Sequence, residues 1–151
     1  MNRVFTQYIA VLIMIFPIAG QAQTEKKLFK RGLERMSANN FTLAEIDFSM
    51  VLQLNPENEI AYYNRGFCRL RTADYPGAVE DFTHTIERDN NNYEAFYNRG
   101  NALKSIGDDI KERENLESAR RVYLQALEDL NFAIAHEKKE PRYYRARAQI
   151  K

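Results

Sequence analysis

The stretch Tyr62-Tyr63-Asn64-Arg65-Gly66 recurs almost unchanged as Phe96-Tyr97-Asn98-Arg99-Gly100, 34 residues further along the chain. A fixed offset of this size is the period of a helix–turn–helix repeat. The residues around each copy keep the same offset, since Phe41, Ala44 and Phe48 precede Tyr75, Ala78 and Phe82 by one period. The sequence therefore predicts a stack of similar helix pairs.

The spacing of large and small residues within each period resembles the tetratricopeptide repeat (TPR) family. That family places a large apolar residue at position 4, small residues at positions 8, 20 and 27, aromatic residues at positions 17 and 24, and proline at position 32. The unit 25–58 supplies Leu28, Gly32, Phe41, Ala44, Phe48, Val51 and Pro56. The unit 59–92 supplies Tyr62, Gly66, Tyr75, Ala78, Phe82 and Thr85, with Asn90 in place of proline. The unit 93–140 supplies Phe96 and Gly100, then Tyr123, Ala126, Leu130 and Ala133 after an insertion at 109–122. The resemblance implies an all-α fold, a right-handed α-solenoid of stacked antiparallel helix pairs over residues 23–151.

Helical periodicity predicts the two helices of the first unit. Apolar residues three to five apart indicate helices over 26–37 and 42–54. Glycine inside a helix costs about 1 kcal/mol relative to alanine, so Gly32, Gly66 and Gly100 at one register imply close packing of the two helices of each pair. Pairs of this kind cannot bury their apolar faces singly and must share a continuous core.

Two charged positions recur in every unit. Position 7 is arginine and position 23 is aspartate, which gives Arg31, Arg65 and Arg99, with Asp47, Asp81 and Asp129. Each arginine lies on a first helix and each aspartate on a second helix. Because every unit carries both partners, we expect ion pairs within each unit that fix the helix hairpin; a ladder of ligand-binding charges is the alternative.

The insertion 109–122 adds about four helical turns, so it can lengthen a helix without rotating its faces. We predict one long helix from about Ile110 to His136, begun by a capping box of Asp109 and Glu112. Alternatively, both helices of the third pair lengthen and turn near Asn115. Alternating charges in the insertion are typical of a solvated helix face. A docking surface for another protein is the alternative interpretation.

The segment 141–151 reads as the first helix of a fourth unit without its second helix. Tyr144, Arg147 and Ala148 take positions 4, 7 and 8, and Pro141 suits a first helical turn. In the TPR family such a capping helix covers the open end of the stack.

The N-terminal segment 1–22 has the composition of a secretory signal peptide. Arg3 is its only charge, Tyr8–Ile18 is apolar, and Gly20 and Ala22 are small residues before a cut at Gln23. An uncleaved anchor is the alternative, although the apolar run is shorter than the roughly 20 residues that span a bilayer. We therefore expect an exported protein, periplasmic in a Gram-negative bacterium and otherwise secreted, with no stable membrane insertion once cleaved. The full sequence has 22 Lys and Arg residues and 21 Asp and Glu residues. Removal of the segment with Arg3 would leave a mature chain with no net charge, which does not indicate binding to nucleic acid.

No residue pattern indicates catalysis. His84 and His136 are the two histidines, and neither lies in the close His, Cys or carboxylate spacing of a metal site. The glycines follow the repeat period rather than a phosphate-binding loop, and the single Cys68 takes a position predicted to be buried. We expect no enzyme activity, no cofactor and no metal.

The TPR resemblance implies a concave groove lined by the first helices, which would bind a peptide segment of another protein. Its predicted residues are Phe29, Leu33, Tyr63, Asn64, Phe67, Tyr97, Asn98 and Asn101. Asparagine can both donate to and accept from an extended peptide backbone. Alternatively, the aromatic residues only pack neighbouring first helices together. The carboxylate clamp for chaperone C-termini is not expected, because Phe29 and Leu33 stand where its lysine and asparagine belong.

Two functions follow from these expectations. The first is a non-catalytic protein–protein interaction module that binds an extended peptide in the groove. The second is a structural or assembly subunit that self-associates or docks through the inserted helix or the end faces of the stack.

Overall fold

The computed structural model describes the backbone of residues 3–113 and 116–150, and the side chains from residue 20 onward within those ranges. The described residues form helices only. These are α1 (Arg3–Ser37), α2 (Phe41–Leu54), α3 (Glu59–Arg71), α4 (Tyr75–Arg88), α5 (Tyr93–Glu112), α6 (Leu116–His136) and α7 (Pro141–Ala148).

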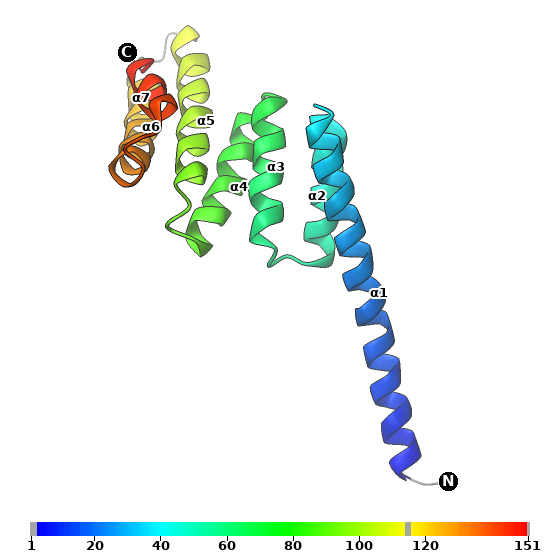
Figure 1. Cartoon of the computed structure of the whole chain (residues 1–151). Coiled ribbons are helices and arrows are strands. Elements are labelled where there is room, and N and C mark those ends of the chain that lie inside the picture. The colour runs from blue at the N-terminus through cyan, green and yellow to red at the C-terminus, as the bar shows by residue number, and fades with distance from the viewer. Residues whose placement is uncertain (1–2, 114–115, 151) are drawn as a thin grey trace.

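The helices stack as three antiparallel pairs, α1 with α2, α3 with α4, and α5 with α6 (Figure 1). The second helix of each pair also contacts the first helix of the next, since α2 meets α3, α4 meets α5, and α6 meets α7. The apolar face of every pair is thereby covered by its neighbours, as the 34-residue period predicts.

Side-chain caps repeat with the same period as the helices. Asn58 and Asn92 accept hydrogen bonds from the backbone N–H groups of Ala61 and Ala95, three residues into α3 and α5. Asn40 and Asp74 cap α2 and α4 in the same way. An N-cap of this type satisfies one of the free N–H groups at a helix start, so each short connection also sets where the next helix begins.

The ends of α1 and α3 have the same backbone conformation. Asn39 and Ala73 adopt left-handed backbone conformations, with φ of 57° and 65°. The next backbone N–H then bonds five residues back, from Asn40 to Arg35 and from Asp74 to Arg69. This is the Schellman type of helix end, and it reverses the chain within three residues.

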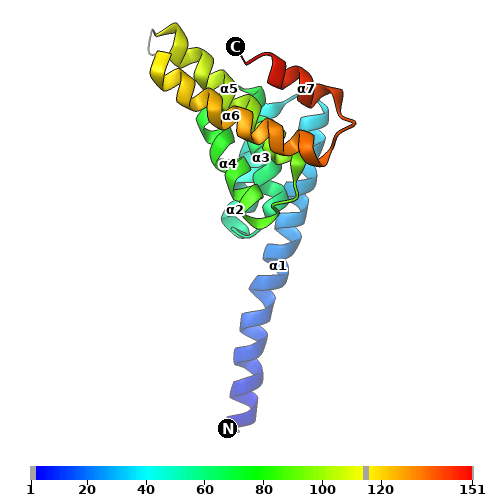
Figure 2. The same ribbon diagram turned by 90° about the vertical axis from the view of Figure 1, so that its left-hand side faces the viewer.

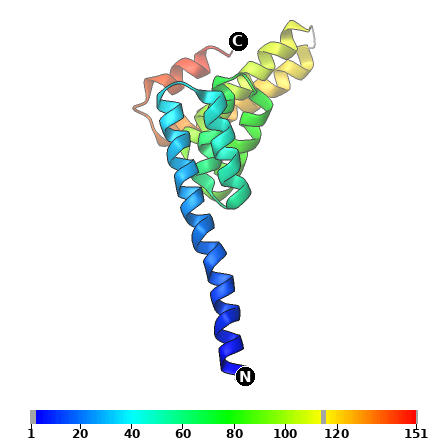
Figure 3. The same cartoon turned by 90° about the vertical axis from the view of Figure 1, so that its right-hand side faces the viewer.

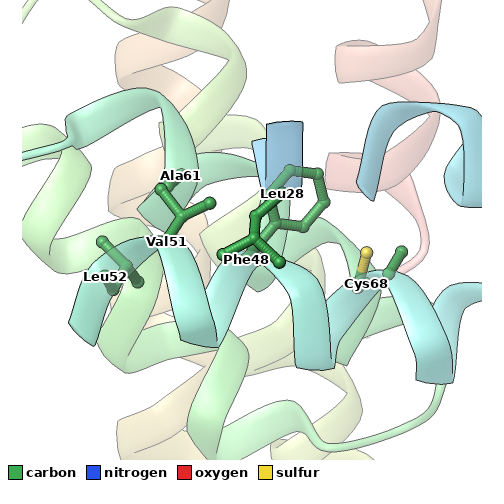
Figure 4. Packing of buried hydrophobic residues seen from close by; sticks show 7 residues of the cluster. Leu28, Phe48, Val51, Leu52, Ala61 and Cys68 are labelled. Atoms are coloured by element: carbon green, nitrogen blue, oxygen red, sulfur yellow. The ribbon is translucent and has the colours of Figure 1, made fainter. Parts of the chain in front are cut away.

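The core of the first two pairs is built from fully buried apolar side chains of α1, α2 and α3 (Figure 4). The cluster includes Phe48 and Val51 of α2, Leu28 of α1 and Ala61 of α3. Cys68 is part of the same cluster and is fully buried, as predicted.

The glycines at position 8 lie where the paired helices touch. A Cβ atom at Gly32 would lie 2.8 Å from the Phe48 ring, and one at Gly100 would lie 3.0 Å from Leu130 Cγ. Neither distance leaves room for a side chain without movement, so the repeated glycines allow these close crossings.

The prediction of one long helix through the insertion is wrong. α5 continues to Glu112 and α6 begins at Leu116, so both helices lengthen and the chain turns between them. Asp109 and Glu112 lie in the last turns of α5 and do not form a capping box at a helix start. The turn predicted near Asn115 lies outside the described residues. The lengthened pair projects beyond the shorter pairs in both side views (Figures 2 and 3).

The projecting part of the α5–α6 pair has its own close contacts. A Cβ atom at Gly107 would lie 2.5 Å from the Tyr123 ring, so the two helices cross closely there too. The Tyr123 hydroxyl donates to Asp108 Oδ1 over 2.7 Å, and Lys104 Nζ donates to Asp108 Oδ2 over 2.7 Å. Burial and the bond to this carboxylate raise the pKa of Tyr123 to about 12. Burial acts to raise the pKa of Asp108, but the bonds from Lys104 and Tyr123 outweigh it and lower that pKa.

α7 closes the end of the stack through two buried side chains, Tyr143 and Ala146. They take positions 3 and 6, which Ala61 and Asn64 fill in α3. Tyr144, predicted at position 4 of this unit, is exposed, and its hydroxyl donates to the carbonyl of Lys138 over 3.2 Å. Lys151, the last residue of the predicted segment, lies outside the described part.

The N-terminal half of α1 extends away from the stack (Figure 3). The predicted first helix, 26–37, is the end of this longer helix. The side chains of residues 3–19 and the whole of Met1 and Asn2 lie outside the described part, so cleavage of the segment 1–22 stays a prediction. In the part of the chain that the structure describes, none of the helices has the length and apolar content to cross a membrane.

Candidate functional site

The structure joins each arginine at position 7 to the aspartate at position 23 of its own unit. The Nη2–Oδ1 distances are 2.5 Å for Arg31–Asp47, 2.6 Å for Arg65–Asp81 and 2.7 Å for Arg99–Asp129. In each case Nε donates to the same carboxylate, so the contact is bidentate. These pairs hold the two helices of a unit together, as the recurrence of both partners in every unit predicts.

A second arginine, four residues further along, joins the first two of these pairs. Arg35 Nη1 lies 2.7 Å from Asp47 Oδ2, and Arg69 Nη1 lies 3.0 Å from Asp81 Oδ2. Both aspartates are fully buried. Burial raises the pKa of Asp81 above its ordinary value, although Arg65 and Arg69 act to lower it.

The predicted groove asparagines Asn64 and Asn98 donate hydrogen bonds to groups of the protein itself. Asn64 is buried, and its amide donates to the carbonyl of Ile60 in the same helix over 2.8 Å. Asn98 is buried, and its amide donates to the Tyr63 hydroxyl over 3.1 Å. Burial raises the pKa of Tyr63. The pair therefore joins α3 to α5, which is the packing role that was the alternative to peptide binding.

Tyr97 also packs against the next first helix. Its ring centroid lies 4.8 Å from that of Tyr143 in α7, and the Arg142 guanidinium lies over its face. Glu94, one turn earlier on α5, accepts hydrogen bonds from both of these α7 residues. The third unit's share of the predicted groove is thus partly covered by the chain's own last helix.

The remaining predicted residues divide between packing and exposure. Phe29 makes an edge contact with Phe48, and Phe67 makes one with Phe41. Leu33 has 42% of its surface exposed, and Asn101 is half-buried. Ile60, at position 2 of the second unit and on the same helix face, is 58% exposed.

Two cavities lie beside Ile60, at the N-terminal end of α3. The larger has a volume of about 280 Å³ and is lined by α1 and the start of α3, including Glu25, Phe29 and Asn58. The smaller has a volume of about 100 Å³ and lies between α3 and the end of α4, beside Tyr63. Ile60 lines both, so this exposed isoleucine adjoins the two hollows.

The described side chains offer little for chemistry. Among residues 20–113 and 116–150, no three His, Cys, Asp or Glu residues gather as a metal site would require. Burial raises the pKa of Cys68 to about 12, so this thiol stays protonated at neutral pH and is a poor nucleophile.

Comparison with solved structures identifies the architecture. The TPR domain of Arabidopsis OM64 superposes with a TM-score of 0.73, at 18% identity, covering 87% of this chain and 97% of that domain. The second TPR domain of human RPAP3, in complex with an HSP70 peptide, gives 0.67 at 21% identity, covering 88% and 97%. The TPR2B domain of yeast Sti1, in a pHsp70 complex, gives 0.68 at 17% identity, covering 85% and 96%. The chain has a tetratricopeptide-repeat fold.

The TPR fold of this chain is a right-handed α-solenoid of three helix pairs and a seventh, capping helix in the described part. No family model matches the sequence. No curated protein matches it either. At identities of this size the comparison establishes the fold, and function has to be argued from the surface of this chain.

Proposed function

We propose that this chain is a non-catalytic protein-interaction module that binds an extended segment of a partner across the first helices. The observation that carries this proposal is the exposure of two large apolar side chains on first helices, Leu33 and Ile60, of which Ile60 lines the cavity of about 280 Å³. An exposed apolar patch next to a hollow is typical of an interaction site. The TPR domains of RPAP3 and Sti1, solved in complex with HSP70 ligands, support binding of this kind.

The ligand that fits this surface is apolar and extended. Asn64 and Asn98 use their amides inside the fold. Recognition therefore depends on apolar contacts with Ile60 and Leu33, because Glu25 and Asn58 of the cavity wall are also bonded to each other. Full burial of one such side chain contributes about 1.5–3 kcal/mol.

A peptide-display selection on the full chain, followed by fluorescence polarisation with the selected peptides, tests the proposal. We expect Ile60→Lys to weaken binding about tenfold or more, as loss of one buried isoleucine predicts. Ile46→Lys is the matched control, because Ile46 is 50% exposed but lies on α2. Peptides that bind equally to wild type and Ile60→Lys, or that are lost only with Ile46→Lys, would refute the proposed surface.

Self-association through the projecting α5–α6 pair is a second candidate. Leu116 and Leu124 are 66% and 51% exposed there, and they line a cavity of about 280 Å³ with Tyr123 and Leu127. If copies of the chain pair over this surface, light scattering gives a dimer mass for wild type and a monomer mass for Leu124→Glu. A monomer at all concentrations of wild type would exclude it.

We also propose that the protein is exported and cut before Gln23. The composition of residues 1–22 supports this, and the packing is compatible with it: Glu25, whose Oε1 accepts bonds from Asn55 and Asn58, lies after the cut. N-terminal sequencing of the protein from its native host checks both points. A mature chain that begins at Met1 would contradict cleavage.

A further inference from the structure

We propose that the third unit holds a binding site for an arginine side chain of a partner protein, between α4, α5 and α6. The site is separate from the surface around Ile60 and does not depend on it. It rests on a comparison of the three units of this chain, and on a cavity at the position where they differ.

In the first two units a second arginine fills one particular place. Arg69 Nη1 donates to Asp81 Oδ2 over 3.0 Å and to the carbonyl of Gly77 over 3.2 Å. Gly77 lies one helical turn before Asp81 on α4. Arg35 makes the equivalent contacts in the first unit, with Asp47 and with the carbonyl of the residue four positions earlier.

In the third unit the equivalent residue is not an arginine. Counting four residues from Arg99, as from Arg65 to Arg69, leads to Leu103. Asp129 is therefore held by Arg99, with Nε–Oδ2 at 2.8 Å and Nη2–Oδ1 at 2.7 Å, and Arg99 Nη1 donates to Thr83 on α4.

A cavity of about 320 Å³ lies where the second arginine would be. Three of its lining residues take places found around Arg69: Asp129 that of Asp81, Gln125 that of Gly77, and Leu103 that of Arg69 itself. Val79 takes the place of Glu45, which pairs with Arg69 in the second unit. The other lining residues are Val79, Thr83, Arg99 and Glu128. The fold thus keeps the hollow and the acceptor, and lacks the side chain that fills them in the other two units.

The chemistry of the hollow favours a guanidinium group. Asp129 Oδ2 is bonded to Arg99, whereas Asp81 Oδ2 is bonded to two arginines, so the third unit offers the acceptor that Arg69 uses. The carboxylate of Glu128, exposed on α6, adds a second negative charge to the lining. Val79 and Leu103 supply an apolar wall for the methylene stem. A planar guanidinium can meet a carboxylate and a carbonyl at once, whereas an ammonium acts as a point charge.

The test uses the full chain and a small probe. ¹⁵N NMR spectra are recorded during titration with N-acetyl-arginine amide, and with N-acetyl-lysine amide for comparison. We expect saturable shifts at Thr83, Leu103, Gln125 and Glu128, with a dissociation constant in about the millimolar range for so small a ligand. Arginine is expected to bind at least about fivefold more tightly than lysine, because it alone is bidentate.

Two variants at one position decide the origin of the shifts. Leu103→Arg supplies the missing side chain from within, so the shifts from the probe should fall at least about tenfold. Leu103→Met keeps an uncharged side chain of similar volume and should retain them. Circular dichroism verifies that both variants are folded.

Three outcomes would overturn the proposal: no saturable shifts at these residues, equal binding of the lysine probe, or undiminished shifts in folded Leu103→Arg. If Leu103→Arg fails to fold, Glu128→Gln on α6 decides. Loss of its charge should then weaken arginine binding about twofold or more, and unchanged binding would count against the site.

Discussion

At the scale of single residues, the unusual feature is a row of aspartates buried between helices and held by arginines. Taking a carboxylate out of water is costly, and the raised pKa of Asp81 indicates that its burial outweighs the attraction of Arg65 and Arg69. A buried pair of this kind therefore adds little net stability compared with apolar residues. Removal of one partner is different, because it leaves a buried charge that has lost its bidentate contact.

A double-mutant cycle on Arg65 and Asp81 measures this effect. We expect Arg65→Met and Asp81→Asn each to lower the free energy of unfolding by about 3–5 kcal/mol, as for other buried pairs. The double variant should lose clearly less than the sum, since either single change already removes the contact between Arg65 and Asp81. Urea denaturation provides the values. Strictly additive losses would show that the two residues do not interact.

The ion pairs made by the arginines at position 7 could be predicted from the sequence, and those made by the second arginines, Arg35 and Arg69, could not. Every unit has an arginine at the position of Arg65 and an aspartate at the position of Asp81, so their pairing follows from the repeat. Arg35 and Arg69 also lie 34 residues apart, but the third unit breaks the pattern with Leu103. Only the structure shows that this substitution coincides with a cavity.

At the scale of helices, the close crossing at position 8 decides how each pair packs. A Cβ atom at Gly66 would lie 3.0 Å from Asp81 Cβ and 3.1 Å from the Phe82 ring. The aspartate that takes part in the ion pair therefore also limits the space at the crossing. The helix pair and its ion pair depend on the same small residue.

Gly66→Leu should overpack this crossing. We expect the free energy of unfolding to fall by about 1–3 kcal/mol, because Asp81 and Phe82 have little freedom to move. Thermal unfolding followed by circular dichroism measures the loss. Glu80→Leu is the control, since it adds the same side chain at an exposed position of α4. Equal melting temperatures for Gly66→Leu and wild type would contradict the account of the glycines.

The insertion shows where helix prediction from periodicity fails. Leu116, Tyr123 and Leu130 continue one apolar stripe, and that stripe is the same whether one helix or two contain it. The better signal was Gly107, seven residues after Gly100 and so on the same face of α5. A glycine there indicates that the close crossing, and with it the first helix, continues past the usual length. The Tyr123 ring packed at Gly107 agrees with that interpretation.

The candidate surface illustrates a second limit of sequence reasoning. Tyr63 and Asn98 suit both a peptide-binding groove and an inter-helix contact, and one sequence gives no means of choosing. In the structure the tyrosine hydroxyl accepts from the asparagine amide, which joins α3 to α5. Ile60, at position 2 of the same helix, stays exposed.

At the scale of the whole molecule, each helix pair is stabilised by its contacts with the neighbouring pairs. α3 is covered by α2 on one side and by α4 and α5 on the other, and α7 covers the end of the α5–α6 pair. Stability of such a stack is mainly a sum of nearest-neighbour contacts. A single pair taken out of the stack would expose Ala61 and Asn64, which adjoining pairs now cover.

The most direct test of this central claim is circular dichroism with heating, applied to the excised second pair, residues 59–92, and to the full chain. The full chain should show strong helical signal and one cooperative transition. The excised pair should show weak signal that declines gradually, because its two outer faces lack their partners. A cooperative transition in the excised pair, at a temperature close to that of the full chain, would contradict the account.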